Sequence, residues 1–462
     1  MKLYRSAVTP AILVLMVMLT ACTQHIPYRT NNEFCINSGQ SNSQNCDAHS
    51  IQQLPAGEGA NYLLGFIEFD DQGQLWDRKQ MKAVVDKFAT EAANKDLLMV
   101  VFVHGWQHNA APEDGNIKTF RNVLTKLSMD EKHFSEASGQ PARQVAGVYL
   151  GWRGESISVP LVKNLTFWDR KNTAEKVGHG GVTEVLNRLE QLKSAKDSTQ
   201  SGSSATRLIV IGHSFGGAIV HNALTQILES RFIHTTGPAG LASDAKGFGN
   251  LVVLINPAFE AGQYTPLSDM STERGFYFES QLPVVAILTS EADYATRYAF
   301  PAGRWLSTLF ESTHLSTRNN AVTHQEETIS QDDANVAAVG HFKPYRTHKL
   351  YPEQVLLRSS VDVPSSDKSV RSALAAASVW AANDAPGSKI SIADLTLERT
   401  NTSAGRNPYL VIQVDRNLIA NHNDIDDPRI IDFIQQLIFI SNLPEESKKS
   451  LIKKVDIPSP SN

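Results

Sequence analysis

The chain has 462 residues, of which 41% are hydrophobic, and its formal net charge is −5 at neutral pH. This length and this hydrophobic share are sufficient for a large buried core. A mildly acidic chain lacks the basic surface that nucleic-acid binding requires, so we expect no nucleic-acid partner.

The first 21 residues have the pattern of a signal peptide. Basic residues precede a short apolar run over 11–19, which is too short to span a bilayer comfortably. The following Leu19-Thr20-Ala21-Cys22 resembles the lipobox of bacterial lipoproteins, which implies cleavage before Cys22 and acylation of that cysteine. We therefore expect a lipid anchor in the bacterial cell envelope, and Thr23 after the cysteine favours the outer membrane. The alternative is an ordinary signal peptide that ends near a cysteine.

Residues 22–59 are rich in Asn, Gln and Ser, and this composition predicts a polar tether. Cys35 and Cys46 lie close together in this segment. In an oxidising compartment we expect them to form a disulfide that closes a small loop. Their spacing is not that of a zinc site.

From residue 60 onward, apolar strand patterns alternate with helical patterns. Helices are expected over Arg78–Ala93, Ile117–Asp130 and Gly181–Ala195, after Ser214, and from Pro428 onward. Strands are expected over Tyr62–Phe69, Leu97–Val103, Gln144–Leu150, Leu208–Ile211, Leu251–Ile255, Pro283–Thr289 and Tyr409–Val414. This alternation predicts an α/β domain over residues 60–445, with a mostly parallel sheet and helices on both faces.

Two segments do not follow this alternation. The segment from about residue 300 to residue 407 is expected to be a long insert before the last strand. The sequence pattern leaves open whether this insert is a lid or a surface excursion. Residues 446–462 are expected to be a polar tail.

The most informative segment is Gly212-His213-Ser214-Phe215-Gly216, which lies between an apolar strand and an apolar helix. A serine at such a strand–turn–helix has the pattern of a nucleophile elbow. Glycines at 212 and 216 avoid clashes across the tight turn, and Gly217 allows the helix to pack close to the sheet. The interpretation places the Ser214 hydroxyl at the carboxyl end of the strand, beside the first amides of a helix.

Together with Val103-His104-Gly105-Trp106 after an earlier strand, and an acid and a histidine later in the chain, the elbow resembles the α/β-hydrolase superfamily. Within it, the chain looks like esterase- or lipase-type bacterial lipoproteins. The resemblance implies the chain order Ser, acid, His, with Ser214 as nucleophile, Asp293 as acid and His422 as base. The alternatives for the base are His341 and His348 within the insert, followed by His314 and His324, and the alternatives for the acid are Glu291 and Glu260.

Two backbone amides are needed to stabilise an oxyanion. The Phe215 N–H directly after the nucleophile is one candidate, and the Trp106 N–H is the other. We expect His104 and His213 to have structural roles. Arg153 is open to two interpretations, a contact to an anionic substrate group or a structural salt bridge.

No metal-binding or nucleotide-binding motif is present in the sequence, and we expect no metal and no cofactor. The resemblance implies a membrane-anchored serine hydrolase that cleaves a small-molecule or lipid ester. The alternatives are an inactive surface lipoprotein with a binding role, and an acyltransferase or peptidase with the same triad.

Overall fold

The structure is a computed structural model, and it describes residues 25–39, 44–155, 167–199, 204–236, 243–308, 310–353, 379–380 and 385–441. The predicted signal peptide, Cys22 and the polar tail lie outside these residues. Among the helices of the described ranges, none combines the length and the apolar character that a membrane crossing needs.

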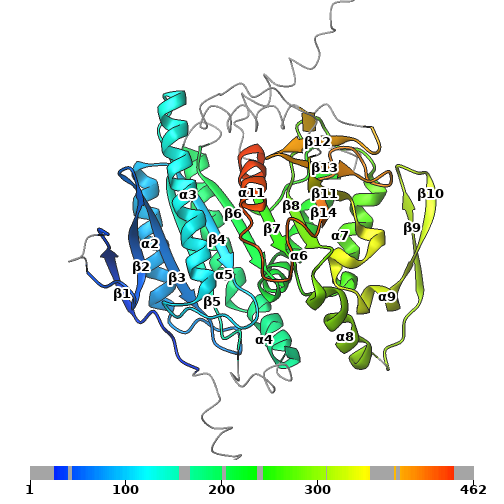
Figure 1. Cartoon of the computed structure of the whole chain (residues 1–462), viewed down its shortest axis with the longest axis horizontal. Coiled ribbons are helices and arrows are strands. Elements are labelled where there is room, and N and C mark those ends of the chain that lie inside the picture. Colours follow the sequence, from blue (N-terminus) through cyan, green and yellow to red (C-terminus); the bar gives the residue numbers. More distant parts are fainter. Residues whose placement is uncertain are drawn as a thin grey trace, which may run out of the picture.

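A twelve-stranded sheet runs through the centre of the molecule (Figure 1). Its eight central strands, β3 to β11 in spatial order, are all parallel, whereas both edges contain antiparallel pairs. In spatial order the strands are β1 (Asn31–Ile36), β2 (His49–Gly57), β3 (Ala60–Glu68), β5 (Gln144–Gly151), β4 (Leu97–Val103), β6 (Arg207–His213), β7 (Leu251–Ile255), β8 (Val285–Ser290), β14 (Tyr409–Val414), β11 (His348–Pro352), β13 (Leu395–Arg399) and β12 (Lys389–Ile392). A separate hairpin pairs β9 (Leu315–Asn320) with β10 (Gln325–Ser330).

Helices cover both faces of this sheet. One face carries α2 (Arg78–Asn94), α4 (Phe167–His179), α5 (Gly181–Thr199), α6 (Phe215–Thr236) and α7 (Ala261–Arg274), and the other carries α3 (Gly115–Ser138) and α11 (Pro428–Ser441). The short elements are the π-helix η2 (Ala295–Ala299), α8 (Phe300–Thr308), α9 (Gln331–Val336), and the 3-10 turns η3 (Val339–His341) and η4 (Lys343–Tyr345). The predicted fold class, α/β with a mostly parallel sheet between two helical layers, is confirmed.

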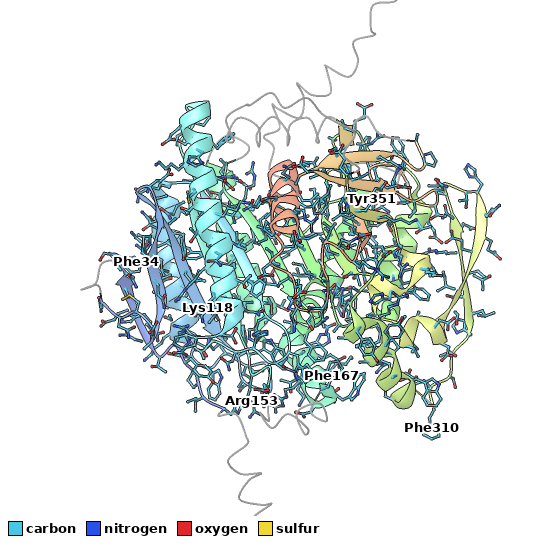
Figure 2. All side chains as sticks on the ribbon, in the orientation of Figure 1. Phe34, Lys118, Arg153, Phe167, Phe310 and Tyr351 are labelled. Carbon is cyan, nitrogen blue, oxygen red and sulfur yellow. A yellow bond between two sulfur atoms is a disulfide. The ribbon has the colours of Figure 1, made fainter. Side chains whose placement is uncertain are left out.

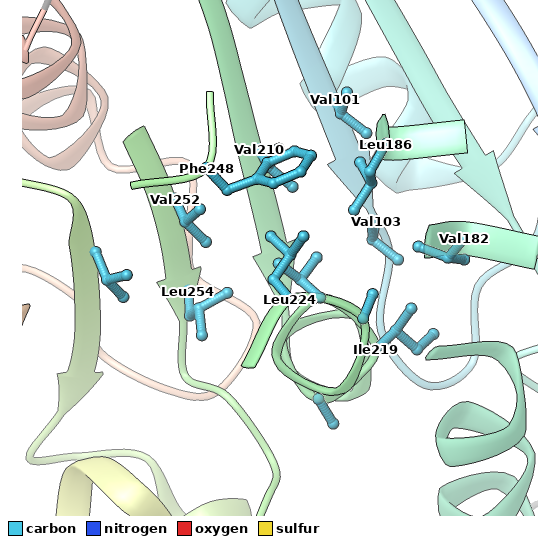
Figure 3. Packing of buried hydrophobic residues seen from close by; sticks show 14 of the residues in the cluster. Val101, Val103, Val182, Leu186, Val210, Ile219, Leu224, Phe248, Val252 and Leu254 are labelled. Carbon is cyan, nitrogen blue, oxygen red and sulfur yellow. The ribbon is translucent and has the colours of Figure 1, made fainter. Parts of the chain in front are cut away.

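The core is divided into two clusters by the sheet. Figure 3 shows part of one cluster, in which Val101 of β4 and Val210 of β6 pack with Leu224 of α6 and Leu186 of α5. All four side chains are fully buried, and burial of each such side chain contributes about 1.5–3 kcal/mol. The parallel strands are apolar on both faces for this reason, and this packing fixes the position of the loops at their carboxyl ends.

The structure corrects the prediction of a polar tether over 22–59. Strand β1 pairs with β2, and β2 pairs with β3, so this segment extends the main sheet. The buried Gln52 side chain is satisfied within the segment, because it donates to the carbonyls of Cys46 and His49. Cys46 is joined to Cys35 of β1 by a disulfide.

The insert also contributes to the sheet. Strands β11, β12 and β13 fall within the predicted insert and form one end of the sheet, with β11 parallel to β14. The described part of residues 300–407 therefore extends the sheet by three strands, whereas the β9–β10 hairpin and the short helices of the insert lie outside the sheet.

Candidate active site

Ser214 occupies a sharp bend between β6 and α6. Its φ angle is +55°, in the left-handed region that non-glycine residues rarely adopt. A Cβ at Gly212 would lie 2.6 Å from the Gly216 carbonyl oxygen, and one at Gly216 would lie 2.0 Å from the Val103 carbonyl oxygen. These two glycines are needed because backbone crosses backbone on both sides of Ser214.

The loop after β4 approaches Ser214 from the other side. A Cβ at Gly105 would lie 2.7 Å from Ser214 Cβ and 3.3 Å from Ser214 Oγ. Only a glycine allows this approach without displacement of the serine. The role of Gly105 follows from the structure and was not predicted from the sequence.

His104 holds this loop in place. Its Nδ1 lies 2.9 Å from the Gly105 carbonyl oxygen and therefore carries the proton, while its Nε2 accepts a hydrogen bond from the Trp152 amide at 3.1 Å. Trp152 Nε1 donates in turn to the His104 carbonyl oxygen. Burial lowers the pKa of His104 to about 4, so this ring is neutral at physiological pH.

The structure brings Ser214, His422 and Asp293 together from three separate strand ends. His422 Nε2 lies 2.7 Å from Ser214 Oγ, and His422 Nδ1 lies 2.9 Å from Asp293 Oδ2. An ionised carboxylate only accepts hydrogen bonds, so Nδ1 carries the ring proton and Nε2 accepts from the serine hydroxyl. Ser214 and Asp293 are buried, and His422 is partly accessible.

Asp293 is held in the ionised form by its surroundings. Burial alone would raise its pKa, but hydrogen bonds from His422 and Thr296, together with the His422 charge, hold the pKa of Asp293 below its ordinary value. The Thr296 amide donates to Oδ1 at 3.1 Å, and its hydroxyl donates to Oδ2. Thr296 was not predicted from the sequence.

His341, the first alternative for the base, contacts Thr296, the residue that donates to the Asp293 carboxylate. Its Nε2 lies 3.0 Å from Thr296 Oγ1, and no hydrogen bond to Ser214 is formed among the described residues. Burial lowers the pKa of His341 to about 4, a larger effect than the opposing charge of Asp293. This neutral ring is therefore placed to donate a hydrogen bond to Thr296.

The remaining alternatives are placed elsewhere. His348 is buried in β11 and stacks on Trp380, whereas His314 and His324 lie beside the β9–β10 hairpin. Glu291 accepts a hydrogen bond from the Gln413 side chain, and Glu260 forms buried ion pairs with Lys171 and Arg304.

The backbone of His422 is anchored by two donors. His213 Nε2 and Asn256 Nδ2 each lie 3.0 Å from the His422 carbonyl oxygen. Burial, with a smaller contribution from the charge of His422, lowers the pKa of His213 to about 3. A neutral ring with its proton on Nε2 donates to this carbonyl, so His213 and Asn256 fix the loop that carries His422. The role of Asn256 was not predicted, although its position directly after β7 was a usable signal.

The two expected oxyanion donors are the backbone amides of Phe215, which follows Ser214 in the chain, and of Trp106, in the loop after β4. Phe215 is the first residue of α6, where amides have no carbonyl partner in a preceding helical turn. Trp106 follows Gly105, the residue that contacts Ser214. The rings of Trp106 and Phe215 both contact Phe167 of α4, at centroid distances of 5.3 and 4.8 Å, and form an aromatic wall beside the serine (Phe167 is labelled in Figure 2).

Arg153 is engaged in an ion pair. Its guanidinium contacts Asp71, which also accepts from Arg170 at 3.0 Å. Arg170 reaches the Arg153 carbonyl oxygen as well. This network favours the structural interpretation of Arg153. Across the described ranges, no cluster of three or more His, Cys, Asp or Glu side chains has a metal-binding arrangement.

No protein-family model matches this chain, and none of the curated proteins matches it either. Among solved structures, a similar chain is the phospholipase PlaB from Legionella pneumophila in complex with thio-NAD. The two are 14% identical, the match covers 78% of this chain and 62% of that chain, and the TM-score is 0.24.

Proposed function

We propose that the protein is a serine hydrolase of the α/β-hydrolase type that cleaves carboxylic esters through an acyl-serine intermediate. Ser214 is the nucleophile, His422 the general base and Asp293 the residue that orients it. The observation that carries this proposal is the continuous hydrogen-bond chain from Ser214 Oγ through His422 to Asp293, with lengths of 2.7 and 2.9 Å. Both lengths lie within the range that proton transfer requires.

The first half of the reaction forms the acyl-serine. Ser214 Oγ attacks the ester carbonyl carbon while its proton passes to His422 Nε2. Asp293 stabilises the resulting imidazolium, and its depressed pKa keeps it ionised throughout. The Phe215 and Trp106 amides then donate to the new oxyanion, and the loss of one such donor costs about 3 kcal/mol of transition-state stabilisation.

The second half restores the enzyme. The tetrahedral intermediate collapses, the bond between the carbonyl carbon and the alcohol oxygen breaks, and His422 returns its proton to the leaving alcohol. Water then attacks the acyl-serine with His422 as base, the bond between the acyl carbon and Ser214 Oγ breaks, and His422 returns the proton to Oγ as the carboxylic acid departs.

The substrate class and the location are part of the same proposal. Esters are favoured over amides by analogy with the superfamily. Acylation of Cys22 would place the enzyme on an envelope membrane, most simply the outer membrane, where lipid esters are available. Several acyl chains on one cysteine hold a protein stably on a membrane, whereas one chain binds only marginally.

A fluorophosphonate probe tests the nucleophile. We expect the folded protein to be labelled at Ser214, and Ser214→Ala to be unlabelled. A p-nitrophenyl ester series of increasing chain length then gives the acyl preference, with Ser214→Ala as the background. Esters, amides and alcohol acceptors assayed together separate hydrolysis from acyl transfer and peptidase activity.

Absence of labelling in folded wild-type protein would favour the alternative of an inactive surface lipoprotein with a binding role. Folding is checked on the same sample by near-UV circular dichroism, so a misfolded preparation is not mistaken for an inactive one.

A further inference from the structure

The segment that follows Asp293 exposes an unusual number of aromatic side chains. Tyr294 is 70% exposed, Tyr298 52%, Trp305 60% and Phe310 99%. All four lie on η2, on α8 or directly beside these elements. We call these four residues the aromatic rim.

The aromatic rim lies at the same edge of the sheet as the active site. Strand β8 ends at Ser290, so the residues that follow it lie at the carboxyl ends of the parallel strands, where Ser214 and His422 also lie. Helix α8 packs on α4 at this edge, with the rings of Phe300 and Trp168 at 5.9 Å. Figure 2 shows Arg153, Phe167 and Phe310 along this one edge of the molecule.

The first described residue, His25, lies at this edge too. Its ring contacts the Trp76 ring at a centroid distance of 4.9 Å, and its Nε2 lies 3.9 Å from Asp71. Both partners follow β3, which is parallel to the central strands and ends at Glu68. The chain therefore enters the fold at the edge that carries the active site.

The short chain distance between Cys22 and His25 limits how far this edge can lie from a membrane. Cys22 precedes His25 by three residues, and three extended residues span at most about 10 Å. If Cys22 is acylated, as proposed above, its acyl chains bring this edge to within roughly that distance of the bilayer surface. Tyrosine and tryptophan are the residues that accumulate at membrane–water interfaces, because each has an apolar ring and a polar group.

We propose that the aromatic rim is a docking surface for a lipid bilayer, and that it holds the active site against the membrane in which the protein is anchored. This docking proposal extends the proposed function and rests on one part of it, the acylation of Cys22. The substrate would then reach Ser214 from the membrane side, which favours lipid esters of the same bilayer over water-soluble esters as natural substrates.

The chain provides its own probe for this surface. Of the six tryptophans, all of which lie in the described ranges, Trp305 is the one with a largely exposed side chain. Full-length protein is mixed with phosphatidylcholine vesicles, with or without bromine atoms on the acyl chains. Bromine quenches indole fluorescence only at close contact, so Trp305 should be quenched, and Trp305→Phe should remove most of the quenching.

The opposite edge supplies matched controls. Phe276 is 54% exposed and Ile233 59%, and they lie near the ends of α7 and α6, where the parallel strands begin. Tryptophan introduced by Phe276→Trp in the Trp305→Phe background should not be quenched. Trp305→Ser with Phe310→Ser should weaken co-flotation with vesicles, whereas Phe276→Ser with Ile233→Ser should not.

Equal quenching at the two edges, or no quenching of Trp305, would overturn the docking surface. The measurement needs no turnover and is repeated in Ser214→Ala, so it is independent of the proposed chemistry. Quenching without fluorophosphonate labelling would support the docking surface and contradict the proposed serine hydrolase. Labelling without quenching would support the hydrolase and contradict the docking surface.

Discussion

Gly105→Ala tests whether the loop after β4 sets the position of the nucleophile. The added Cβ would lie 2.7 Å from Ser214 Cβ and 3.0 Å from the His213 carbonyl oxygen. Carbon atoms in ordinary contact are about 3.5 Å apart or more. Either the loop or Ser214 must therefore move by roughly 0.8 Å, the gap between these two separations.

We expect this movement to affect kcat more than it affects the free energy of unfolding. A misplacement of about 1 Å can reduce a rate about 100-fold, so we expect kcat to fall by roughly 10- to 100-fold, or about 1.4–2.7 kcal/mol in activation free energy. Overpacking of this kind also lowers the free energy of unfolding by about 1–3 kcal/mol. The protein should thus remain folded while it loses most of its turnover.

Steady-state hydrolysis of a short p-nitrophenyl ester measures kcat, and urea denaturation measures the free energy of unfolding. Gly115→Ala is the matched control, because a Cβ at this first position of α3 meets no atom within 4 Å. Wild-type kcat in folded Gly105→Ala would refute the assignment of the loop beside Ser214.

Three further predictions concern the histidines and the acid. His422→Ala should abolish ester turnover, whereas His341→Ala should retain most of it, and the reverse result in the same assay would assign the base to His341. Asp293→Asn should lower kcat by about 10⁴-fold by favouring the wrong tautomer of the base, with near-UV circular dichroism to verify the fold; a loss below tenfold would contradict its role. Burial lowers the pKa of His348 to about 3, so the unfolded chain binds a proton below pH ~6.5 that the folded chain does not, and stability falls as pH decreases through this window. Urea denaturation gives the free energy of unfolding at pH 7.5 and at pH 5. The loss of this free energy between the two pH values should be about 2 kcal/mol smaller in His348→Gln than in the wild type. An equal loss in both proteins would show that His348 does not bind this proton.

The sequence predicts the central sheet well because its strands are continuous apolar runs. The ranges expected for β4, β7 and β14 agree with the structure at both ends. Buried parallel strands have this pattern as a consequence of contact with helices on both faces. The edges of the sheet were not predicted, because β1 and β2 carry polar residues that are satisfied by hydrogen bonds and resemble a linker in composition alone.

Three residues of the candidate site were predictable because the α/β-hydrolase superfamily, which the chain resembles, has the chain order Ser, acid, His. Ser214, Asp293 and His422 follow strands that the pattern identified, so the loops that carry them share one edge. Thr296 and Asn256 act through contacts that span long distances in the chain or depend on side-chain direction. Such contacts leave no periodic signal in the sequence.

The three groups of the triad enter the chain in a fixed order, and the last one comes late. His422 is 208 residues beyond Ser214 and 129 beyond Asp293. A nascent chain that has not yet reached this loop has the elbow but lacks the base. Under the proposed function, the chain therefore gains ester turnover only after the residues up to His422 have been synthesised and folded.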